Sequence, residues 1–529
     1  MTLKLHNTLT KQLDDFTPQL GREVSLYTCG PTVYNYLHVG NWSAYIYWDI
    51  LVRVLTANDY DVTRVMNITD VGHLVSDADD GEDKLEKGAR REGKTAWQIA
   101  QIYTADFIDG MEKLNLTTPQ FITKATEYIP QQLDLVRTLK QRGFTYQIDD
   151  GIYFDTSKFP TYVEFAGLDL DAQRAGARVT FNDQKRNPSD FALWKFTPTG
   201  EKRDMQWETP NDLLDTTSND SVGAFTDALQ SEGELTSGPN SAQERSSVSE
   251  STERVSDHTD AKMGFPGWHL ECSAMSMSIL GNTIDIHTGG IDHIPVHHTN
   301  EIAQSEAASG QLFSRFWLHN NHLKVDGTKI SKSLGNGYTL QQLGERGFSP
   351  MDYRMFVLQS HYSHEGNFTF DNLTAAKNRL RNWRSAAALR HQIHDTLQND
   401  TLHAHDDKFV SLLATSGAIL EAMNDDLNTP AALSIIDEAF GRLQAATPDT
   451  IYRHGLIHAL ESIDELLGLN LIGSTPDIDD DAKQLILQRE RARDAKDWGT
   501  SDQLRDQLLR RAIVVRDTND GSVWEYADN

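Results

Sequence analysis

Apolar and polar positions near the start of the chain predict a parallel α/β unit. Val24–Cys29 (VSLYTC) has the composition of a buried strand, and Gly30 and Pro31 end it. Trp42–Ala57 (WSAYIYWDILVRVLTA) carries an apolar stripe at helical spacing, and Asp61–Ile68 (DVTRVMNI) predicts a second strand. A strand, a helix and a strand in this order form the crossover unit of a parallel sheet.

Helical and polar stretches alternate along the rest of the chain. Residues 73–145 show helical spacing, except for Asp77–Asp83 (DADDGED). That segment predicts a solvated loop, because its glycine falls one position too early for an EF-hand. Residues 211–262 are rich in Ser, Thr, Asp and Glu without periodicity, which is typical of a disordered insert. The pattern is helical again from about 345 to 470, and a polar break at Thr475–Asp481 precedes a small last module.

A second group of α/β elements follows the insert. Thr283–His287 (TIDIH) predicts a short strand, and a helix is expected near His298–Ser309. Phe316–Val325 and Lys329–Ser333 flank Asp326-Gly327, which predicts two strands joined by a hairpin turn.

The composition describes a folded protein of several domains. The chain has 529 residues, of which 38% are hydrophobic and 9% aromatic, so it can bury a sizeable core. Its 77 acidic and 49 basic residues give a net charge of −28, which at first sight disfavours nucleic-acid partners. The start, MTLKLHNTLTKQLDD, lacks a signal-peptide pattern, and no apolar run would span a membrane. We therefore expect a cytoplasmic protein with no membrane contact.

Cysteine and histidine positions suggest a metal site. Only two cysteines are present, Cys29 and Cys272, which excludes a disulfide-stapled domain and an all-cysteine metal site. His297 and Glu301 lie four residues apart at the start of a helix, so their side chains share one face. Two thiolates, an imidazole and a carboxylate would suit zinc; alternatively, the cysteines are unrelated buried thiols. The surrounding segment is dense in histidine, at His269, His287, His293, His297 and His298.

Two further segments could bind phosphate. Leu37–Asn41 (LHVGN) runs into a helix N-terminus, where free N–H groups attract anions and Gly40 allows close approach. The alternative is an ordinary helix cap. Lys329–Asn336 (KISKSLGN) is basic and rich in hydroxyl groups in an otherwise acidic chain, which suits stabilisation of a phosphoryl group. The alternative here is a solvated loop.

Together these segments resemble a known enzyme family. HVGN and KISKS resemble the HIGH and KMSKS signatures of class I aminoacyl-tRNA synthetases. Six blocks resemble cysteinyl-tRNA synthetase in the family's order, over nearly the whole chain except the insert: CGPTVYNYLHVGN, NITD (67–70), KRNPSDFALWK (185–195), GWHLECSAM, GGIDHIPVHHTNEIAQ and KISKSLGN. The resemblance implies an α/β fold with a Rossmann-type parallel-sheet catalytic domain over 1–345, including the insert 211–262. A stem-contact and helical-bundle region over 346–475 and a small α+β anticodon-binding module over 476–529 would follow.

The resemblance also implies roles for individual residues. One Zn²⁺ would be bound by Cys29, Cys272, His297 and Glu301, and would select the thiolate of cysteine against the hydroxyl of serine. The cysteine pocket would be lined by Thr69, Trp268, His287 and Asp292. The ATP site and catalytic signatures would contain His38, Gly40, Asn41, Lys329 and Lys332. Asn41 replaces the family's second signature histidine, so it can donate a hydrogen bond but cannot carry a charge.

The implied reaction has two steps. The carboxylate of L-cysteine attacks the α-phosphorus of ATP, accompanied by Mg²⁺, which gives cysteinyl-adenylate and pyrophosphate. The cysteinyl group is then transferred to the 3′ end of tRNA(Cys), and AMP is released. Lys332 would stabilise the pentacoordinate phosphorus. Near the C-terminus, RARDAKDWGTSDQLRDQLLRRAIVVRDTNDGSVW resembles the family's anticodon-binding module. Anticodon contacts are implied for Arg493, Trp498, Asp502 and Asp517.

Three other functions remain open at this point. A mycothiol-type cysteine ligase shares the catalytic half but lacks a tRNA-reading module. A zinc hydrolase built on His297 and Glu301 would leave HVGN and KISKS unexplained. A catalytically silent binding protein is a third alternative. For a synthetase, we expect a monomer whose acidic surface makes charging more effective as salt screens its repulsion of tRNA.

Overall fold

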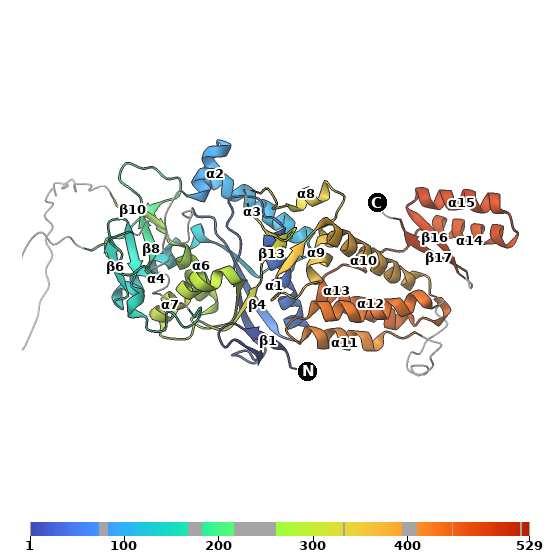
Figure 1. The fold of residues 1–529 in the computed structure, drawn as a ribbon, viewed down its shortest axis with the longest axis horizontal. Coiled ribbons are helices and arrows are strands. Elements are labelled where there is room, and N and C mark those ends of the chain that lie inside the picture. The colour runs from blue at the N-terminus through green and yellow to red at the C-terminus, as the bar shows by residue number, and fades with distance from the viewer. Residues whose placement is uncertain are drawn as a thin grey trace, which may run out of the picture.

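The computed structural model describes most of the chain. The described residues are 2–72, 83–167, 182–215, 261–331, 334–393, 410–446, 448–518 and 521–527. Lys332, most of the predicted loop at 77–83 and most of the insert at 211–262 lie outside them. Figure 1 shows an elongated arrangement, in which an α/β part is followed by a helical region and a small module at the opposite end.

A five-stranded parallel sheet organises the α/β part, in the order β12-β11-β3-β4-β5. Its strands are β3 (Glu23–Thr28), β4 (Asp61–Ile68), β5 (Phe121–Lys124), β11 (Ile284–Gly290) and β12 (Ser314–Asn320). The predicted strand-helix-strand unit is confirmed, with α1 (Val39–Ala57) crossing from β3 to β4. The strand β4 lies on one side of β3 and β11 lies on the other, so the strand order reverses at β3. A crevice is therefore expected between the carboxyl ends of β3 and β11.

Helices and an antiparallel sheet extend this part. The helices are α2 (Lys84–Glu92), α3 (Ala96–Lys113), α4 (Ile129–Gln141), α6 (Trp268–Leu280) and α7 (Thr299–Ser309). The second sheet has the order β6-β7-β8-β10-β9, with β6 (Thr145–Ile148), β7 (Gly151–Phe154), β8 (Phe191–Phe196), β9 (Trp207–Glu208) and β10 (Met263–Pro266). A small hairpin pairs β1 (Lys4–Asn7) with β2 (Gln12–Asp15). The helical interpretation of 73–145 is wrong at β5, a short edge strand whose four residues show no helical or alternating pattern.

A three-stranded sheet follows β12. It contains β13 (Leu323–Val325), β14 (Thr328–Lys329) and β15 (Gly366–Phe368). The turn at Asp326 (φ 49°) and Gly327 (φ 72°) is confirmed, and both positive φ angles match the twist of a tight hairpin. The prediction of one strand over Phe316–Val325 is wrong, because the chain breaks between β12 and β13.

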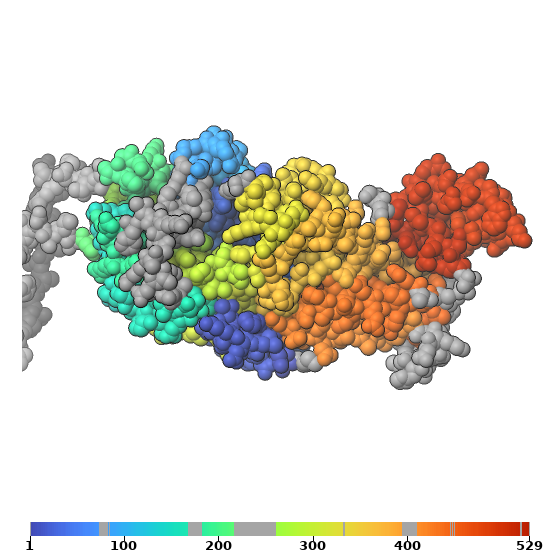
Figure 2. Space-filling model, viewed as in Figure 1, coloured from blue at the N-terminus to red at the C-terminus, as the bar shows by residue number. Residues whose placement is uncertain are grey.

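The second half of the chain is largely helical. Its helices are α8 (Leu340–Gly344), α9 (Pro350–Leu358), α10 (Phe370–Ala388), α11 (Leu413–Met423), α12 (Thr429–Ala445) and α13 (Arg453–Leu467). The last module contains α14 (Asp480–Asp494), α15 (Trp498–Arg510), β16 (Ile513–Thr518) and β17 (Gly521–Tyr526). Figure 2 shows this module as a separate lobe beside the helical region. Gln392 joins the two through hydrogen bonds of 2.8 and 3.0 Å with the backbone of Trp524.

A buried ion cluster ties the first helix to the helical region. Arg354 on α9 is fully buried and donates to Asp49 on α1 at 2.5 Å and to the carbonyl of Leu467 at 2.7 Å. Arg53, also on α1, donates to Asp49 at 2.7 Å and to the carbonyl of Asp464 at 3.2 Å. The parallel sheet and the helices that follow it therefore share one hydrophobic and ionic core. Within the described residues, no helix combines the length and the apolar character needed to cross a bilayer.

Candidate functional site

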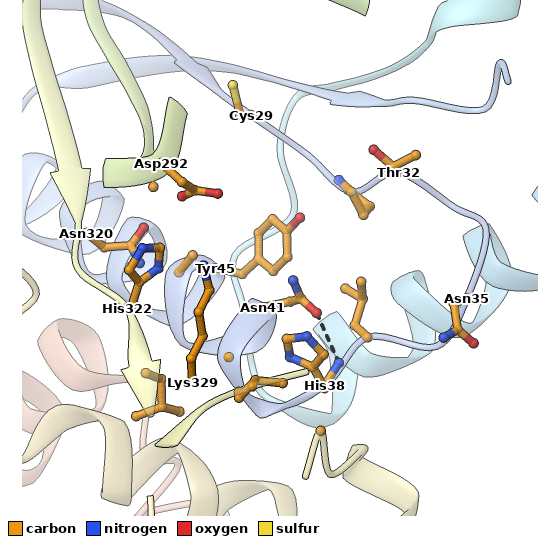
Figure 3. A pocket seen from close by; sticks show the side chains of 18 of the residues that line it. Cys29, Thr32, Asn35, His38, Asn41, Tyr45, Asp292, Asn320, His322 and Lys329 are labelled. Atoms are coloured by element: carbon orange, nitrogen blue, oxygen red, sulfur yellow. Dashed lines mark hydrogen bonds between the residues drawn. The ribbon is translucent and has the colours of Figure 1, made fainter. Parts of the chain in front are cut away.

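A pocket of about 840 Å³ opens at the carboxyl ends of the central strands. Cys29 directly follows β3, Gly290 ends β11 and Asn320 ends β12, and all three line the pocket. Figure 3 shows side chains from these ends facing the helix α1 and the hairpin strand β14. This is the crevice at which α/β sheets bind their ligands.

The two signature-like segments meet on one side of this pocket. The backbone of His38 pairs with that of Thr339, and the amide of Val39 donates to the carbonyl of Tyr338 at 2.8 Å. A Cβ added to Gly40 would lie 2.7 Å from the Cδ1 atom of Ile330, so the Ile330 side chain would have to shift to admit a larger residue. The glycine of HVGN therefore lies directly against the KISKS segment, although the two are far apart in sequence.

Asn41 and Lys329 add polar groups to the same wall. The Oδ1 atom of Asn41 accepts from the backbone N–H of His38 at 3.2 Å, so Asn41 caps the first turn of α1 (Figure 3). Lys329 extends from β14 into the pocket (Figure 3). A helix N-terminus and a lysine thus face one space, an arrangement that favours a phosphorylated ligand.

Deeper in the crevice, four side chains form a candidate metal centre. The ligand atoms of Cys29, Cys272, His297 and Glu301 all lie within 4.8 Å of one another. They come from the end of β3, from α6, from the π-helical turn Ile294–His298 and from α7. Tetrahedral zinc, with ligand distances of about 2.0–2.3 Å, needs only slightly smaller separations. Two thiols, an imidazole and a carboxylate gathered this closely in the interior are donors that zinc prefers, so the donor set fits a cation.

Within this cluster, a proton on His297 balances the negative charge of Glu301. Burial alone would lower the pKa of His297, but the Glu301 carboxylate, whose Oε1 atom lies 2.8 Å from Nε2, raises it to about 10. Burial would raise the pKa of Glu301, but His287 and His297 outweigh it and lower it to about 2. A hydrogen bond from Cys272 lowers the pKa of the Cys29 thiol. A cation would take the place of the proton on His297.

A second set, formed by Cys29, His287, His298 and Glu301, also lies within 4.8 Å. His298 is engaged elsewhere, because its Nδ1 atom lies 2.7 Å from Nε2 of His319. His319 in turn lies 2.7 Å from the hydroxyl of Thr8. Burial keeps the pKa of both His298 and His319 well below the ordinary value, so both are neutral. This series of hydrogen-bonded side chains ends at Cys29, whose Sγ atom lies 3.4 Å from Nε2 of His298.

Two of the four residues predicted for the cysteine pocket, Trp268 and His287, contact candidate ligands directly. Trp268 stacks on His297 with ring centroids 4.2 Å apart, and Nε2 of His287 donates to the Glu301 carboxylate at 2.8 Å. Asp292 lines the pocket beside Cys29 (Figure 3). Thr69 is buried and donates to Glu271 at 3.1 Å. Asp292 therefore faces the open pocket, whereas Thr69 is bonded to Glu271, the residue before Cys272.

Comparison with known proteins covers almost the whole chain. The model of the class I (C) tRNA synthetase catalytic domain matches residues 15–213 and 249–378, a DALR domain matches 418–471, and the cysteinyl-tRNA ligase anticodon binding domain matches 475–524. Cysteine–tRNA ligase 1 of Burkholderia lata is 38% identical, with 98% of this chain and 96% of that protein covered. The cysteine–tRNA ligase of Treponema denticola is 35% identical, with 99% and 100% covered.

The chain belongs to the cysteine–tRNA ligase family. Its fold is that of class I tRNA synthetases more widely. The LeuRS of Agrobacterium radiobacter K84, in a ternary complex with tRNA and LeuAMS, superposes with a TM-score of 0.55 at 13% identity, covering 86% of this chain and 85% of that one. A Mycobacterium tuberculosis methionyl-tRNA synthetase with methionyl-adenylate gives 0.50 at 15% identity, covering 86% and 91%.

The C-terminal module of this cysteine–tRNA ligase family member gathers three of the four predicted anticodon residues. Asp517 accepts from Arg489 at 2.6 Å and pairs with Arg493 at 3.0 Å. The guanidinium of Arg493 lies 5.7 Å from the ring of Trp498, whose side chain is 57% exposed. Asp502 instead pairs along its own helix with Arg505 at 3.1 Å. Trp498 presents an exposed ring, and Arg489 is a buried partner that the sequence did not suggest.

Proposed function

We propose that this chain activates L-cysteine with ATP and transfers it to the 3′ end of tRNA(Cys), using one Zn²⁺ held by Cys29, Cys272, His297 and Glu301. The observation that supports it most directly is that Cys29, one of the four donors, lines the same pocket as residues of both signature segments. A bound zinc would supply a soft Lewis acid that accepts the thiolate of cysteine far better than the hydroxyl of serine.

The surrounding side chains would orient the amino acid. Asp292 faces the pocket beside Cys29, so its carboxylate is available to an ammonium group. Trp268 covers one face of His297 and restricts that ring to one orientation. His287 holds Glu301 from the opposite side at 2.8 Å, and Thr69 would contribute through Glu271. Shape and charge would then exclude larger amino acids before activation.

Nucleotide binding would use the opposite wall. His38 and the N-terminus of α1 would contact the phosphates, with Gly40 giving close approach and Asn41 fixing the helix cap. Lys329 and Lys332 would neutralise the charge that develops around the α-phosphorus and on the leaving pyrophosphate, with Mg²⁺ on the triphosphate. No side-chain nucleophile is needed, so the rate would come from positioning and electrostatics.

The helical region at 346–475 would contact the tRNA stem, and the module at 476–529 would read the anticodon with Arg493, Trp498, Asp502 and Asp517. Exposed Trp498 and the carboxylates suit single-stranded bases, which are read by stacking and by hydrogen bonds to their edges. We further propose a cytoplasmic monomer. A mycothiol-type ligase would have no use for this module, which is why we favour the synthetase.

Cysteine-dependent exchange between ATP and pyrophosphate tests the activation step, and transfer of labelled cysteine to tRNA tests the second. We expect both activities, and we expect a zinc chelator to abolish the exchange. Exchange that depends on serine as well as on cysteine, or label entering an amino sugar instead of tRNA, would contradict the proposal.

A further inference from the structure

Two lysines stand directly opposite each other on the hairpin that leads into the KISKS segment. In the antiparallel pairing of β13 and β14, Lys324 is in register with Lys329. Residues opposite each other in such a pair point to the same face, with Cβ atoms about 4.5–5.5 Å apart, and like charges there are destabilising. Both lysines line the 840 Å³ pocket. The hairpin thus holds two repelling cations against the nucleotide space.

Only one of these cations is compensated. The Nζ atom of Lys324 lies 2.6 Å from Oε1 of Glu365, which precedes β15 and lines the same pocket. Within the described part of the chain, Lys329 forms no ion pair with a carboxylate. The wall therefore carries an excess positive charge that an anionic ligand would relieve.

Lys324 can leave Glu365 for a stronger partner. Their side chains are 38% and 45% exposed, and ion pairs at such exposure contribute only about 0–1 kcal/mol. A polyphosphate offers several oxygens and a higher charge than one carboxylate, so its hydrogen bonds with an ammonium group are stronger. Across the pocket, Asn41 supplies no charge. Lys324 is consequently a second pocket cation beside Lys329.

We propose that Lys324 is a phosphate-binding residue of the activation reaction, which leaves Glu365 and contacts the β- and γ-phosphates of ATP, and then the pyrophosphate. Glu365 holds the ammonium group in place before the nucleotide arrives and competes with the phosphates for it. This inference rests on the proposed synthetase function. It predicts that replacement of Lys324 weakens ATP binding, whereas replacement of Glu365 strengthens it.

The test compares Lys324→Gln and Glu365→Gln in cysteine-dependent ATP–pyrophosphate exchange, with Lys377→Gln on α10 as a control outside the pocket. We expect Lys324→Gln to raise the KM for ATP and for pyrophosphate about tenfold, the effect of losing one charged hydrogen bond, with the KM for cysteine unchanged. Glu365→Gln should lower the KM for ATP, because it removes the competitor. Calorimetric titration should show Lys324→Gln weakening ATP binding but leaving AMP binding unchanged.

A purely structural ion pair would give a different pattern, in which both variants weaken ATP binding equally and AMP binding falls with it. That result, or a Lys324→Gln enzyme with the KM of the wild type, would overturn the inference. Absence of cysteine-dependent exchange in the wild-type enzyme would instead refute the proposed function, so the two failures are distinguishable.

Discussion

Replacement of Arg354 with methionine tests how strongly the catalytic sheet is bound to the helical region. The Arg354 side chain is fully buried and donates to Asp49, to the carbonyl of Leu467 at 2.7 Å and to the carbonyl of Leu114 at 3.0 Å. Arg354→Met would leave two buried carbonyls and one carboxylate without this donor. Loss of one member of a buried ion pair costs about 3–5 kcal/mol. Asp49 retains Arg53 and Thr117, so we expect a value near 3 kcal/mol.

Urea unfolding followed by circular dichroism measures this free energy. The control is Arg22→Met, whose ion pair with Asp59 is 70% and 78% exposed and should change stability by less than about 1 kcal/mol. Arg354→Met combined with Asp49→Leu should recover part of the loss, because no charge is then stranded. A single variant within 1 kcal/mol of the wild type, or a double variant as unstable as the sum of both singles, would refute the reasoning.

The same pair predicts a pH dependence. Burial alone would raise the pKa of Asp49, but Arg354 and Arg53 outweigh it and lower that pKa. A carboxyl group with a lowered folded pKa contributes stability above its unfolded pKa of about 3.9 and loses it as the pH falls through the folded value. The difference between wild type and Arg354→Met should therefore be largest above pH ~4 and shrink in more acidic urea titrations.

Three further predictions concern the site and the tRNA. Cys272→Ser should lose the bound ion and cysteine-dependent exchange, whereas Ser278→Ala on the same helix should keep both; full metal content in Cys272→Ser, measured by atomic absorption, would contradict the ligand set. Trp498→Ala should raise the KM for tRNA by the equivalent of about 1–3 kcal/mol of lost stacking without changing ATP–pyrophosphate exchange, and equal loss of both would point to a folding defect. With a net charge of −28, charging should increase from low to high KCl; a steady decrease would instead indicate ordinary counterion release.

The elements that sequence predicted best are those with the strongest periodicity. The helix α1 is predicted by its apolar stripe, and the strand β4 by a short apolar and β-branched segment; both are largely buried. The strand β5 was missed, because four residues with one buried side chain carry too little pattern. The π-helical turn before α7 has no periodic signal of its own, although it brings His297 to Glu301.

Much of the candidate site was accessible from sequence because its residues occur within recognisable segments. The residues that support it were not, since they depend on contacts between distant positions. Thr8 contacts His319 across 311 positions, and nothing in the local sequence of either residue predicts that contact. Lys324 likewise gains its meaning only from its register opposite Lys329 and from its contact with Glu365.

The pairing of β9 with β10 affects which changes in chain length the fold can tolerate. Glu208 lies opposite Met263, so the chain leaves the sheet and returns to it at adjacent positions. Doubling the length of a flexible loop between fixed ends costs only about 0.6 kcal/mol. A change in the number of residues between these paired ends should therefore add little to the cost of closing the loop, as long as the buried Thr209 and Leu213 are kept. A tag or a reporter domain placed between Leu213 and Met263 would use the fixed ends that this pairing provides.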